Sequence, residues 1–433
     1  MSTTKFVEVG LPSGDDKEEW AKFWKSNKQP WRTEPRISKE RQHELDELRK
    51  IKPDDEQRNY PFKDIKLSRA DVEWLLSTHD NYHGPVNWND ESQREREGLD
   101  LRGADLRYID LQGLPLARII AGPRSHQIIG GQYEAATIHL EGANLQYAHL
   151  EEANLGGAHL EEANLLFAYL GESILSYADL EGADLGGAHL EGASLDGAHL
   201  EGANLATAHL EGAFLFHAYL EGASLDGVFF DRSTNLDCLV LSNKVNDTAS
   251  LSDILWGDVN VAVVDWSVIS TLGDENEAED NKSAYGYETA TRAYRQLSVV
   301  LRNQGLVEHA ARFSYRAQLM QRKVFWHRRR YLSYLGSLFL DFLSGYGYKV
   351  GRCFIAYALV IGIFAMIYHM LGTNPAWNEA IVISMTAFHG RGFFPEQFHP
   401  GDPQALAAAI EAFVGLLIEI TLIATLTQRF FGK

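Results

Sequence analysis

The chain has 433 residues and a formal net charge of −19. Its length gives room for two to four domains, and so acidic a chain excludes nucleic acid as a direct partner, because a polyanion binds to a basic face. The two cysteines, Cys238 and Cys353, lie far apart in the sequence, which excludes a disulfide framework and suits a reducing compartment. Residues 1–10 contain no basic segment followed by an apolar core, so we expect no cleavable signal peptide.

Residues 1–97 are mostly polar and are predicted to form a mostly helical N-terminal segment. Short helices are expected at Lys17–Ser26, Ser38–Lys50 and Ser68–His79. The last of them begins with Ser-Arg-Ala-Asp, which has the spacing of a helix cap. The segment shows no catalytic pattern, and we expect it to serve docking or assembly.

A leucine at every fifth position distinguishes residues 98–266. After a first series and an interruption at Ala117–Gln132, every fifth residue from Leu140 to Leu225 is leucine, and alanine stands two positions before nearly all of them. Neither an α-helix nor an ordinary strand has this period. It predicts a repeat architecture in which each unit is stable only when stacked on its neighbours.

The repeated A(N/D/S)LXX motif resembles the pentapeptide-repeat family over about 130 residues. That resemblance implies a right-handed quadrilateral β-helix with four pentapeptides in each coil. A narrow square shaft has room for one leucine and one alanine on each side, with coils about 4.8 Å apart. We therefore expect residues 98–266 to form such a β-helix together with its capping coil.

A second period, of ten residues, places glutamate and histidine at recurrent positions of the same repeats. On a coil of twenty residues, this period stacks both residue types on two opposite faces. Stacked carboxylates repel one another and need counterions, protons or a basic partner. The candidate ladder comprises Glu141, Glu161, Glu181, Glu201, Glu221, His189, His199 and His209.

Two interpretations of this ladder stay open. It is either a sensor, for a divalent cation or for pH, or a set of solvated residues that keep the domain soluble. The same acidic surface is a candidate site for a cytosolic protein partner. The spacing assigns no definite metal site.

An acidic hinge is predicted at residues 267–284, because the sequence GDENEAEDN offers little to a core. Helical periodicity returns at residues 285–330 and predicts a cytosolic helical hairpin that breaks at Asn303–Gly305. The apolar face of its first helix comprises Ala290, Tyr294, Leu297 and Leu301.

Residues 331–350 combine an apolar face with several polar interruptions. A third membrane span here would put Arg328–Arg330 and Arg352 on opposite sides of the bilayer, against the positive-inside bias. We therefore expect an interfacial helix on the cytoplasmic leaflet, where the flanking arginines meet anionic lipid.

Residues 351–433 contain two apolar runs, Cys353–Leu371 and Ala405–Leu426, each long enough to cross a hydrocarbon core of roughly 30 Å. Basic residues gather before the first run and after the second. This asymmetry predicts a plasma (inner) membrane protein with both termini in the cytoplasm and the connecting loop outside.

The connecting loop is itself apolar, with a short helix expected at Asn378–Phe388, followed by a glycine-bearing turn. Span, short helix, glycine turn and span resemble the two-transmembrane pore-loop channels of the potassium-channel superfamily. Gly390-Arg391-Gly392 falls where that family carries Gly-Tyr-Gly, and Phe388 and His389 stand in place of Thr-Val. The resemblance implies a homotetramer around a path for a monovalent ion. The altered filter leaves cation or anion preference open, according to whether Arg391 faces the axis.

Two carboxylates and one glycine stand out in the second run. Glu411 lies near its outer end and is expected to brace the loop, with Arg391 or His389 as partner. Glu419 either faces the path, which would favour cations, or is a protonated group bonded between helices. Gly415 is a candidate hinge for opening.

No nucleophile–base set, phosphate loop or dinucleotide fingerprint occurs, so we expect no enzyme. The predicted function is a membrane ion channel whose cytosolic repeat domain serves gating, assembly or partner binding. Two alternatives remain, both with a non-conducting pore. One is a membrane-anchored acidic binding module of the DNA-mimicking kind that the pentapeptide-repeat resemblance implies; the other is a membrane-bound scaffold.

Overall fold

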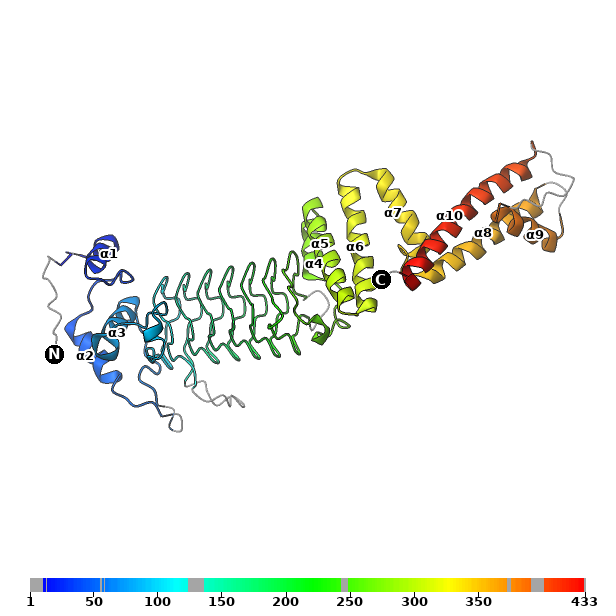
Figure 1. Ribbon diagram of the computed structural model, residues 1–433. Helices are drawn as coiled ribbons and strands as arrows, with labels where there is room; N and C mark the ends of the chain where they lie inside the picture. Colours follow the sequence, from blue (N-terminus) through cyan, green and yellow to red (C-terminus); the bar gives the residue numbers. More distant parts are fainter. Residues whose placement is uncertain are drawn as a thin grey trace. The chain divides into compact units, whose positions relative to one another are not determined.

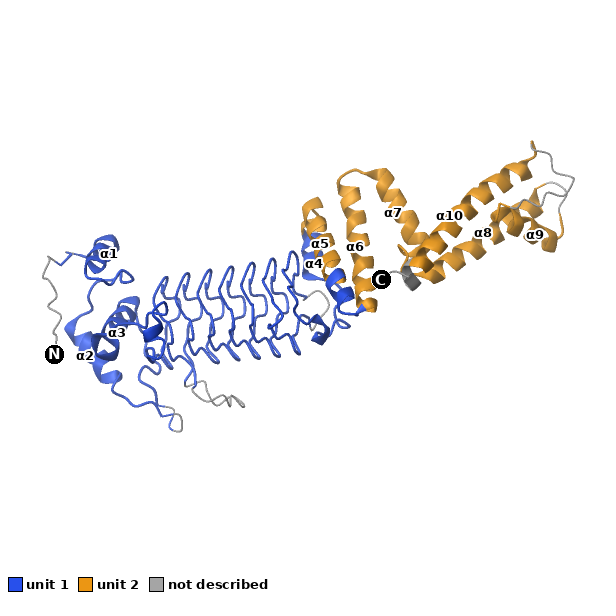
Figure 2. Ribbon diagram, viewed as in Figure 1, with its two compact units in different colours: residues 1–280, 299–306 blue, residues 281–298, 307–433 orange. Residues whose placement is uncertain are grey.

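A computed structural model describes residues 11–431 apart from 13, 55–56, 58, 124–135, 243–247, 372–374 and 391–400 (Figure 1). The chain divides into two compact units (Figure 2). The first comprises residues 1–280 and 299–306, and the second residues 281–298 and 307–433.

Three helices open the first unit at the predicted places: α1 Lys17–Ser26, α2 Lys39–Leu48 and α3 Arg69–Tyr82. The cap that the sequence indicated is present. The Ser68 hydroxyl accepts from the backbone N–H of Asp71, and the Asp71 carboxylate accepts from the backbone N–H of Ser68. This reciprocal pair satisfies two N–H groups that the helix leaves without partners.

The N-terminal segment is continuous with the repeats. Lys66 forms a parallel bridge with Asp105, and the Arg69 guanidinium donates to the carbonyl oxygens of Asp110 and Gln112 at 3.1 and 3.2 Å. The described part of the N-terminal segment is therefore attached to the first coils of the repeat stack through Lys66 and Arg69. A short 3-10 helix, Glu91–Gln93, precedes the first coil.

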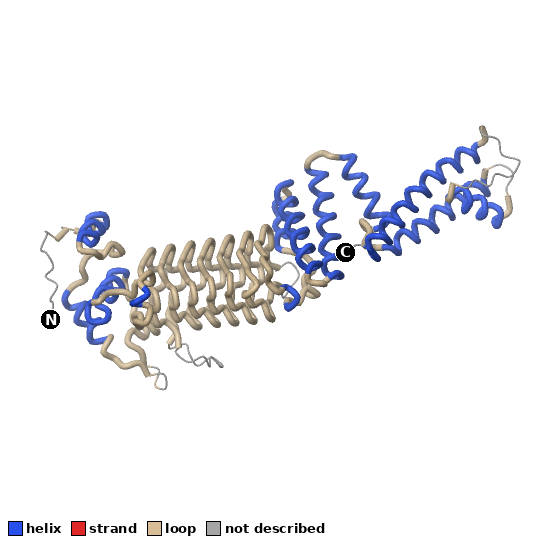
Figure 3. The backbone as a smooth tube through the Cα atoms, viewed as in Figure 1, coloured by secondary structure: helices blue, strands red, loops and turns tan. Residues whose placement is uncertain are grey.

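The leucines at every fifth position fill the interior of the shaft: each of them from Leu140 to Leu225 is at most 2% exposed. Successive coils are joined by parallel bridges between residues twenty apart, such as His139 with His159 and Asn144 with Asn164. In the described part of the chain these bridges are isolated and no continuous strand forms (Figure 3). Each side of the square contributes one bridging residue between two turns, so the predicted β-helix is built without long strands.

The interruption in the leucine series is an insertion within a regular stack. Asp105 pairs with His139, 34 positions later, whereas the following coils pair at a separation of 20, as in His139 with His159. The stack therefore continues across the insertion in register. Most of the inserted residues lie outside the described part of the chain.

The acidic segment expected to be a hinge contains a helix, α4 Gly273–Asn281, and the division between the two units falls within this segment, after Asp280. Asp274 is 3% exposed, and its carboxylate accepts a 2.7 Å hydrogen bond from the backbone N–H of Leu251. The helix itself was not predicted, because the acidic composition does not show that one buried carboxylate can satisfy a backbone group of the last coil.

The turn between the hairpin helices also belongs to the first unit. Gln304 accepts from the backbone N–H of Val261 at 2.8 Å and donates to the carbonyl of Val259 at 2.6 Å. Val261 opens a second 3-10 helix, Val261–Val263, in the capping coil. The amide of Gln304 thus satisfies both kinds of backbone group at the end of the shaft.

The second unit is helical. It contains most of the predicted hairpin, α5 Ala284–Asn303 and α6 Val307–His327, in which Tyr294 and Phe313 are stacked and fully buried. Gly305, at φ +83°, makes the predicted break. There follow α7 Tyr331–Ser344, α8 Val350–Met370, α9 Trp377–Phe388 and α10 Pro403–Phe431.

Candidate functional site

Among the described residues, two helices are long and apolar enough to cross a membrane, Val350–Met370 (α8) and Pro403–Thr427 (within α10). Between them lies α9, which has 12 residues. At 1.5 Å per residue it is about 18 Å long, too short to cross a hydrocarbon core of about 30 Å. The chain therefore offers two possible spans and one short apolar helix between them.

Small side chains allow α9 to pack closely against both long helices. One buried cluster joins the three elements: Ala365 and Tyr368 from α8, Ala380, Ile383 and Ala387 from α9, and Ala407 and Ala408 from α10. In an apolar solvent, close backbone approach over small residues is a main source of helix association.

Gly415 marks the point where α9 ends against α10. A Cβ atom added at Gly415 would lie 2.2 Å from the carbonyl oxygen of Phe388, the last residue of α9. Glycine is the residue type that fits such an approach. The structure thus assigns Gly415 a packing role, and its role as a hinge stays a prediction.

Glu411 is fully buried and links all three helices. Its carboxylate accepts a 2.9 Å hydrogen bond from the Tyr368 hydroxyl of α8 and a second from the Ser384 hydroxyl of α9. Glu411 thus contacts the short helix, but through partners that the sequence reasoning missed, and its role in bracing the loop stays a prediction. The available signal was Ser384, a polar residue within an apolar helix; of the expected partners, His389 bonds elsewhere and Arg391 lies outside the described residues.

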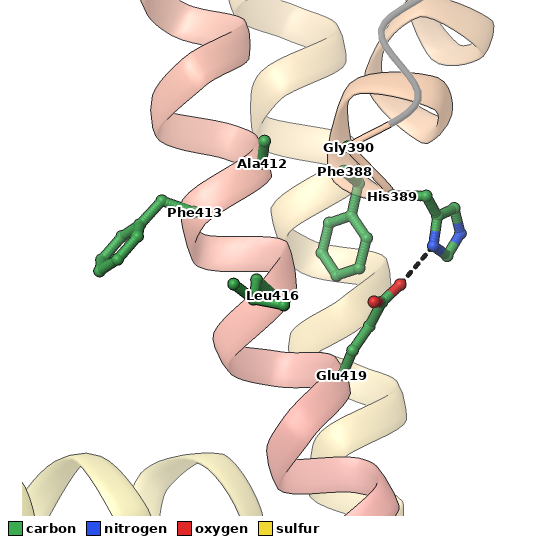
Figure 4. A pocket seen from close by; sticks show the side chains of 7 residues that line it. All are labelled: Phe388, His389, Gly390, Ala412, Phe413, Leu416 and Glu419. Carbon is green, nitrogen blue, oxygen red and sulfur yellow. Dashed lines mark hydrogen bonds and ion pairs between the residues drawn. The ribbon is translucent and has the colours of Figure 1, made fainter.

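His389 stands just beyond α9 and joins the other two helices. Its Nε2 atom is hydrogen-bonded to the Tyr357 hydroxyl of α8 at 3.0 Å. Its Nδ1 atom is hydrogen-bonded to the Glu419 carboxylate of α10, as Figure 4 shows. His389 and Glu419 line a pocket of about 310 Å³. Its walls are Phe388, His389, Gly390, Ala412, Phe413, Leu416 and Glu419. The sequence did not indicate Tyr357.

The predicted filter positions are only partly described. Phe388 is buried edge-on against Tyr357, with ring centroids 4.7 Å apart, and Gly390 has a φ of +66°, which favours glycine. Arg391 and Gly392 lie outside the described residues. Near the turn, Glu419 is the carboxylate that lines the pocket, whereas Glu411 is enclosed among the helices.

A second polar cluster, unpredicted from the sequence, joins α6, α7 and α8. The Asp341 carboxylate accepts from the Tyr315 hydroxyl at 2.9 Å, from Arg322 at 2.7 Å and from Arg352 at 3.1 Å. Burial raises the pKa of Asp341, but the hydrogen bonds from Arg322 and Tyr315 outweigh it and hold the pKa below its ordinary value.

The histidines and glutamates of the repeat shaft form the stacked columns that their period indicated. The ring centroids of His139 and His159 are 4.8 Å apart and those of His189 and His209 are 5.0 Å apart, in each case with nearly parallel rings. Along each coil the histidine Nδ1 faces the glutamate two residues on, as in His199 and Glu201 at 3.3 Å.

Residues 138–176 and 173–212 match the sequence model of the family described as pentapeptide repeats, in eight copies. The chain carries a pentapeptide-repeat domain. With its two apolar helices, it is a pentapeptide-repeat protein with two segments long enough to span a membrane. No curated protein matches the chain.

Several solved structures resemble the pentapeptide-repeat domain. A pentapeptide repeat protein from Nostoc PCC 7120 is 38% identical over 20% of this chain and 72% of its own, with a TM-score of 0.20. Rfr23 from the cyanobacterium Cyanothece 51142 is 34% identical over 32% and 87%, with a TM-score of 0.17. QnrB1, described as a plasmid-mediated fluoroquinolone resistance protein, is 18% identical over 38% and 74%, with a TM-score of 0.27.

Proposed function

We propose that this protein is a homotetrameric cation channel with a cytosolic pentapeptide-repeat domain. The observation that carries the proposal is the position at which α9 ends. Phe388 meets Gly415, which is the middle residue of the 25-residue span Pro403–Thr427. The short helix between the spans therefore ends halfway along a segment that crosses the bilayer.

Backbone that turns at this depth needs a polar surrounding. Groups without a hydrogen-bond partner are costly in lipid, and irregular backbone at membrane depth is tolerated where it is buried in protein or lines a water-filled cavity. The turn at His389 and Gly390 borders a pocket together with Glu419. These features favour a water-filled path at the turn over a lipid-facing loop.

The charges near the turn favour cations. The C-terminal end of a helix carries a partial negative charge, and α9 ends at this turn. Glu419 contributes a carboxylate to the same pocket. A monovalent cation is therefore the proposed permeant ion.

One protomer supplies one side of such a path. Closed cyclic symmetry around the turn would enclose it, and four copies are what the resemblance to pore-loop channels implies. We place both termini in the cytoplasm, because basic residues gather before the first span and after the second, and such residues favour the cytoplasmic side. The acidic repeat domain then lies in the cytosol, where it is available for gating or for a protein partner.

The proposed link between the cytosolic hairpin and the spans is the Asp341 cluster. It ties α6 and α7 to the beginning of α8. On α7, large apolar side chains are exposed, among them Leu332, Leu335 and Phe342. They support an interfacial helix that lies on the cytoplasmic leaflet.

Flux through purified protein tests the proposal. Full-length protein in liposomes should pass K⁺ down a KCl gradient, with a reversal potential on the cation side. Glu419→Gln should shift that potential toward zero, whereas Glu379→Gln, on the exposed first turn of α9, should leave it unchanged. Arg391→Gln should alter the potential only if Arg391 lines the path. Absence of flux from correctly folded tetramers would instead favour the membrane-anchored binding module.

A further inference from the structure

The tripeptide His-Leu-Glu occurs six times in the pentapeptide-repeat domain, beginning at His139, His149, His159, His189, His199 and His209. One coil contains twenty residues, so two such tripeptides stack directly only where their histidines are twenty positions apart. That condition holds for His139 with His159 and for His189 with His209, and the structure bridges both pairs.

At these two places three ligand-type side chains converge. Glu141, His159 and Glu161 bring their donor atoms within 4.8 Å of one another, and so do Glu191, His209 and Glu211. The first set lies on one face of the shaft and the second on the opposite face, because their positions differ by fifty residues, two and a half coils. We propose that these two sets are binding sites for a divalent transition-metal ion of the zinc class.

The spacing of the donor atoms in the two sets is compatible with a shared ion, although His199, which belongs to neither set, lies at a similar 3.3 Å from Glu201. The histidine Nδ1 and the glutamate two residues on are 2.9 Å apart at His139 and 2.8 Å apart at His149. In the proposed sites the same separation is 3.5 Å at His159 and 3.4 Å at His209. Two ligands held tetrahedrally at 2.0–2.1 Å from zinc are roughly 3.3 Å apart.

Carboxylate oxygens at both sites are available for an ion. Glu141 Oε2, Glu161 Oε2 and Glu211 Oε2 are shielded from solvent without a hydrogen-bond partner. Asp179 lies 3.7 Å from His159 Nδ1 and is a candidate fourth ligand. A divalent ion would relieve the repulsion between glutamates of adjacent coils and would also satisfy these oxygens.

His139 and His189, the first histidines of the two stacked pairs, are not metal ligands in this proposal but orient the ligating glutamates. The Nδ1–H group of His139 donates to the Glu141 carboxylate at 2.9 Å, and that of His189 donates to Glu191 at 3.0 Å. A hydrogen bond to a ligating carboxylate orients it and tunes its basicity. Glu181, His199 and Glu201 have the same spacing but do not form a third set. At the position equivalent to His139 and His189 the chain has Asp179, so no histidine orients Glu181, and the Glu181 side chain is exposed.

One imidazole and two or three carboxylates suit Zn²⁺ better than Ca²⁺, which takes six to eight oxygen ligands. The sites do not depend on whether the protein conducts ions.

Equilibrium dialysis of the untagged full-length protein in detergent tests the proposal, with ZnCl₂ at pH 7.5 and excess Mg²⁺. The expected result is two zinc ions per chain. His159→Ala and His209→Ala should each leave one, and the double variant none. Glu141→Gln, which keeps the shape of the side chain, should also leave one.

His149→Ala is the matched control. His149 pairs with Glu151 like the other histidines, but Tyr169 and Gly171 stand in the next coil instead of a second His and Glu. It should retain both ions. Fewer than one zinc per wild-type chain, an equal loss in the His149 and His159 variants, or displacement of the zinc by Ca²⁺ would overturn the proposal. X-ray absorption of the bound zinc should find a nitrogen and oxygen shell with one imidazole.

Discussion

The pentapeptide-repeat domain and the helices α8 to α10 obtain their stability in different ways. In the repeats, the same two side chains, leucine and alanine, fill every layer, and the polar residues on the outside vary without disturbing them. In the helices, single residues are decisive, such as Gly415 against Phe388 and Glu411 between Tyr368 and Ser384. Equal contacts spread the free energy of unfolding over many positions, whereas unequal contacts concentrate it in a few.

The largest effect is expected from a charged side chain placed inside the repeat shaft. Leu185 is fully buried, and Leu185→Lys would place an unpaired ammonium group among the leucines. Burial of an uncompensated charge costs more than about 4 kcal/mol, so the repeat domain should unfold locally and lose its circular dichroism signal.

Leu255→Lys is the control for that prediction. Leu255 belongs to the same domain but is 52% exposed. The substitution should change the melting temperature by no more than a few degrees. Equal destabilisation by the two lysines would mean that burial in the shaft is not what stabilises the coils.

The stability of the repeat domain should also depend on pH, because helix α4 contains the buried carboxyl group of Asp274. Burial and the nearby Asp226 charge raise the pKa of Asp274 to about 7, against the opposing hydrogen bond from Leu251. Because the folded state holds this proton more tightly than the unfolded chain, the free energy of unfolding should fall as the pH rises from about 4 to about 7.

Asp274→Asn should remove most of that pH dependence. At pH 8 the variant should be more stable than the wild type by on the order of 3 kcal/mol, since an amide keeps the acceptor for Leu251 without the charge. Chemical unfolding at pH 5 and pH 8 measures the difference. A wild-type stability that does not change across this range would contradict the buried carboxylate.

Regular features of the fold could be predicted from the sequence. The period of five predicted the shaft and its buried leucines, and the capping Ser68 predicted the start of α3. The apolar runs and the short helix between them predicted α8, α9 and α10 to within five residues at each end. In each of these cases one local rule determines the element without reference to distant residues.

Contacts between distant residues were beyond such rules. Tyr368 lies 43 positions from Glu411, and Tyr315 lies 26 positions from Asp341, and no period relates the members of either pair. The helical structure of α4 was not predicted for the same reason, because the burial of its Asp274 depends on the distant Leu251. Packing of separate elements, which the sequence does not display, selects these partners.

Gly415→Ala tests whether one position decides the packing of α9. The added methyl group would meet the carbonyl of Phe388 at 2.2 Å, and relief of such a contact costs about 1–3 kcal/mol. Ion flux should fall by more than tenfold. Gly362→Ala is the control: its Cβ in α8 would meet nothing within 4 Å, so wild-type flux is expected, and a comparable loss there would deny Gly415 its special role.

Asp341→Asn has the smallest expected effect among these changes and bears on the helices alone. The amide removes the charge that Arg322 and Arg352 share, and we expect a loss of about 1–2 kcal/mol. Because the folded-state pKa of Asp341 lies below its ordinary value, this contribution is present at neutral pH and is lost as the pH falls through the folded-state pKa. Hydrogen exchange of α7 at pH 7 should become faster in the variant.

Glu288→Gln supplies the comparison for Asp341. Its ion pair with Arg328 lies in the same unit, but the two side chains are 33% and 52% exposed, against 17% and 21% for Asp341 and Arg322. Exposed pairs contribute little because water screens them, so this variant should leave the exchange of α7 unchanged. If both variants accelerate the hydrogen exchange of α7 equally, the cluster around Asp341 is an ordinary surface contact. The helices would then depend less on single residues than the comparison with the repeats indicates.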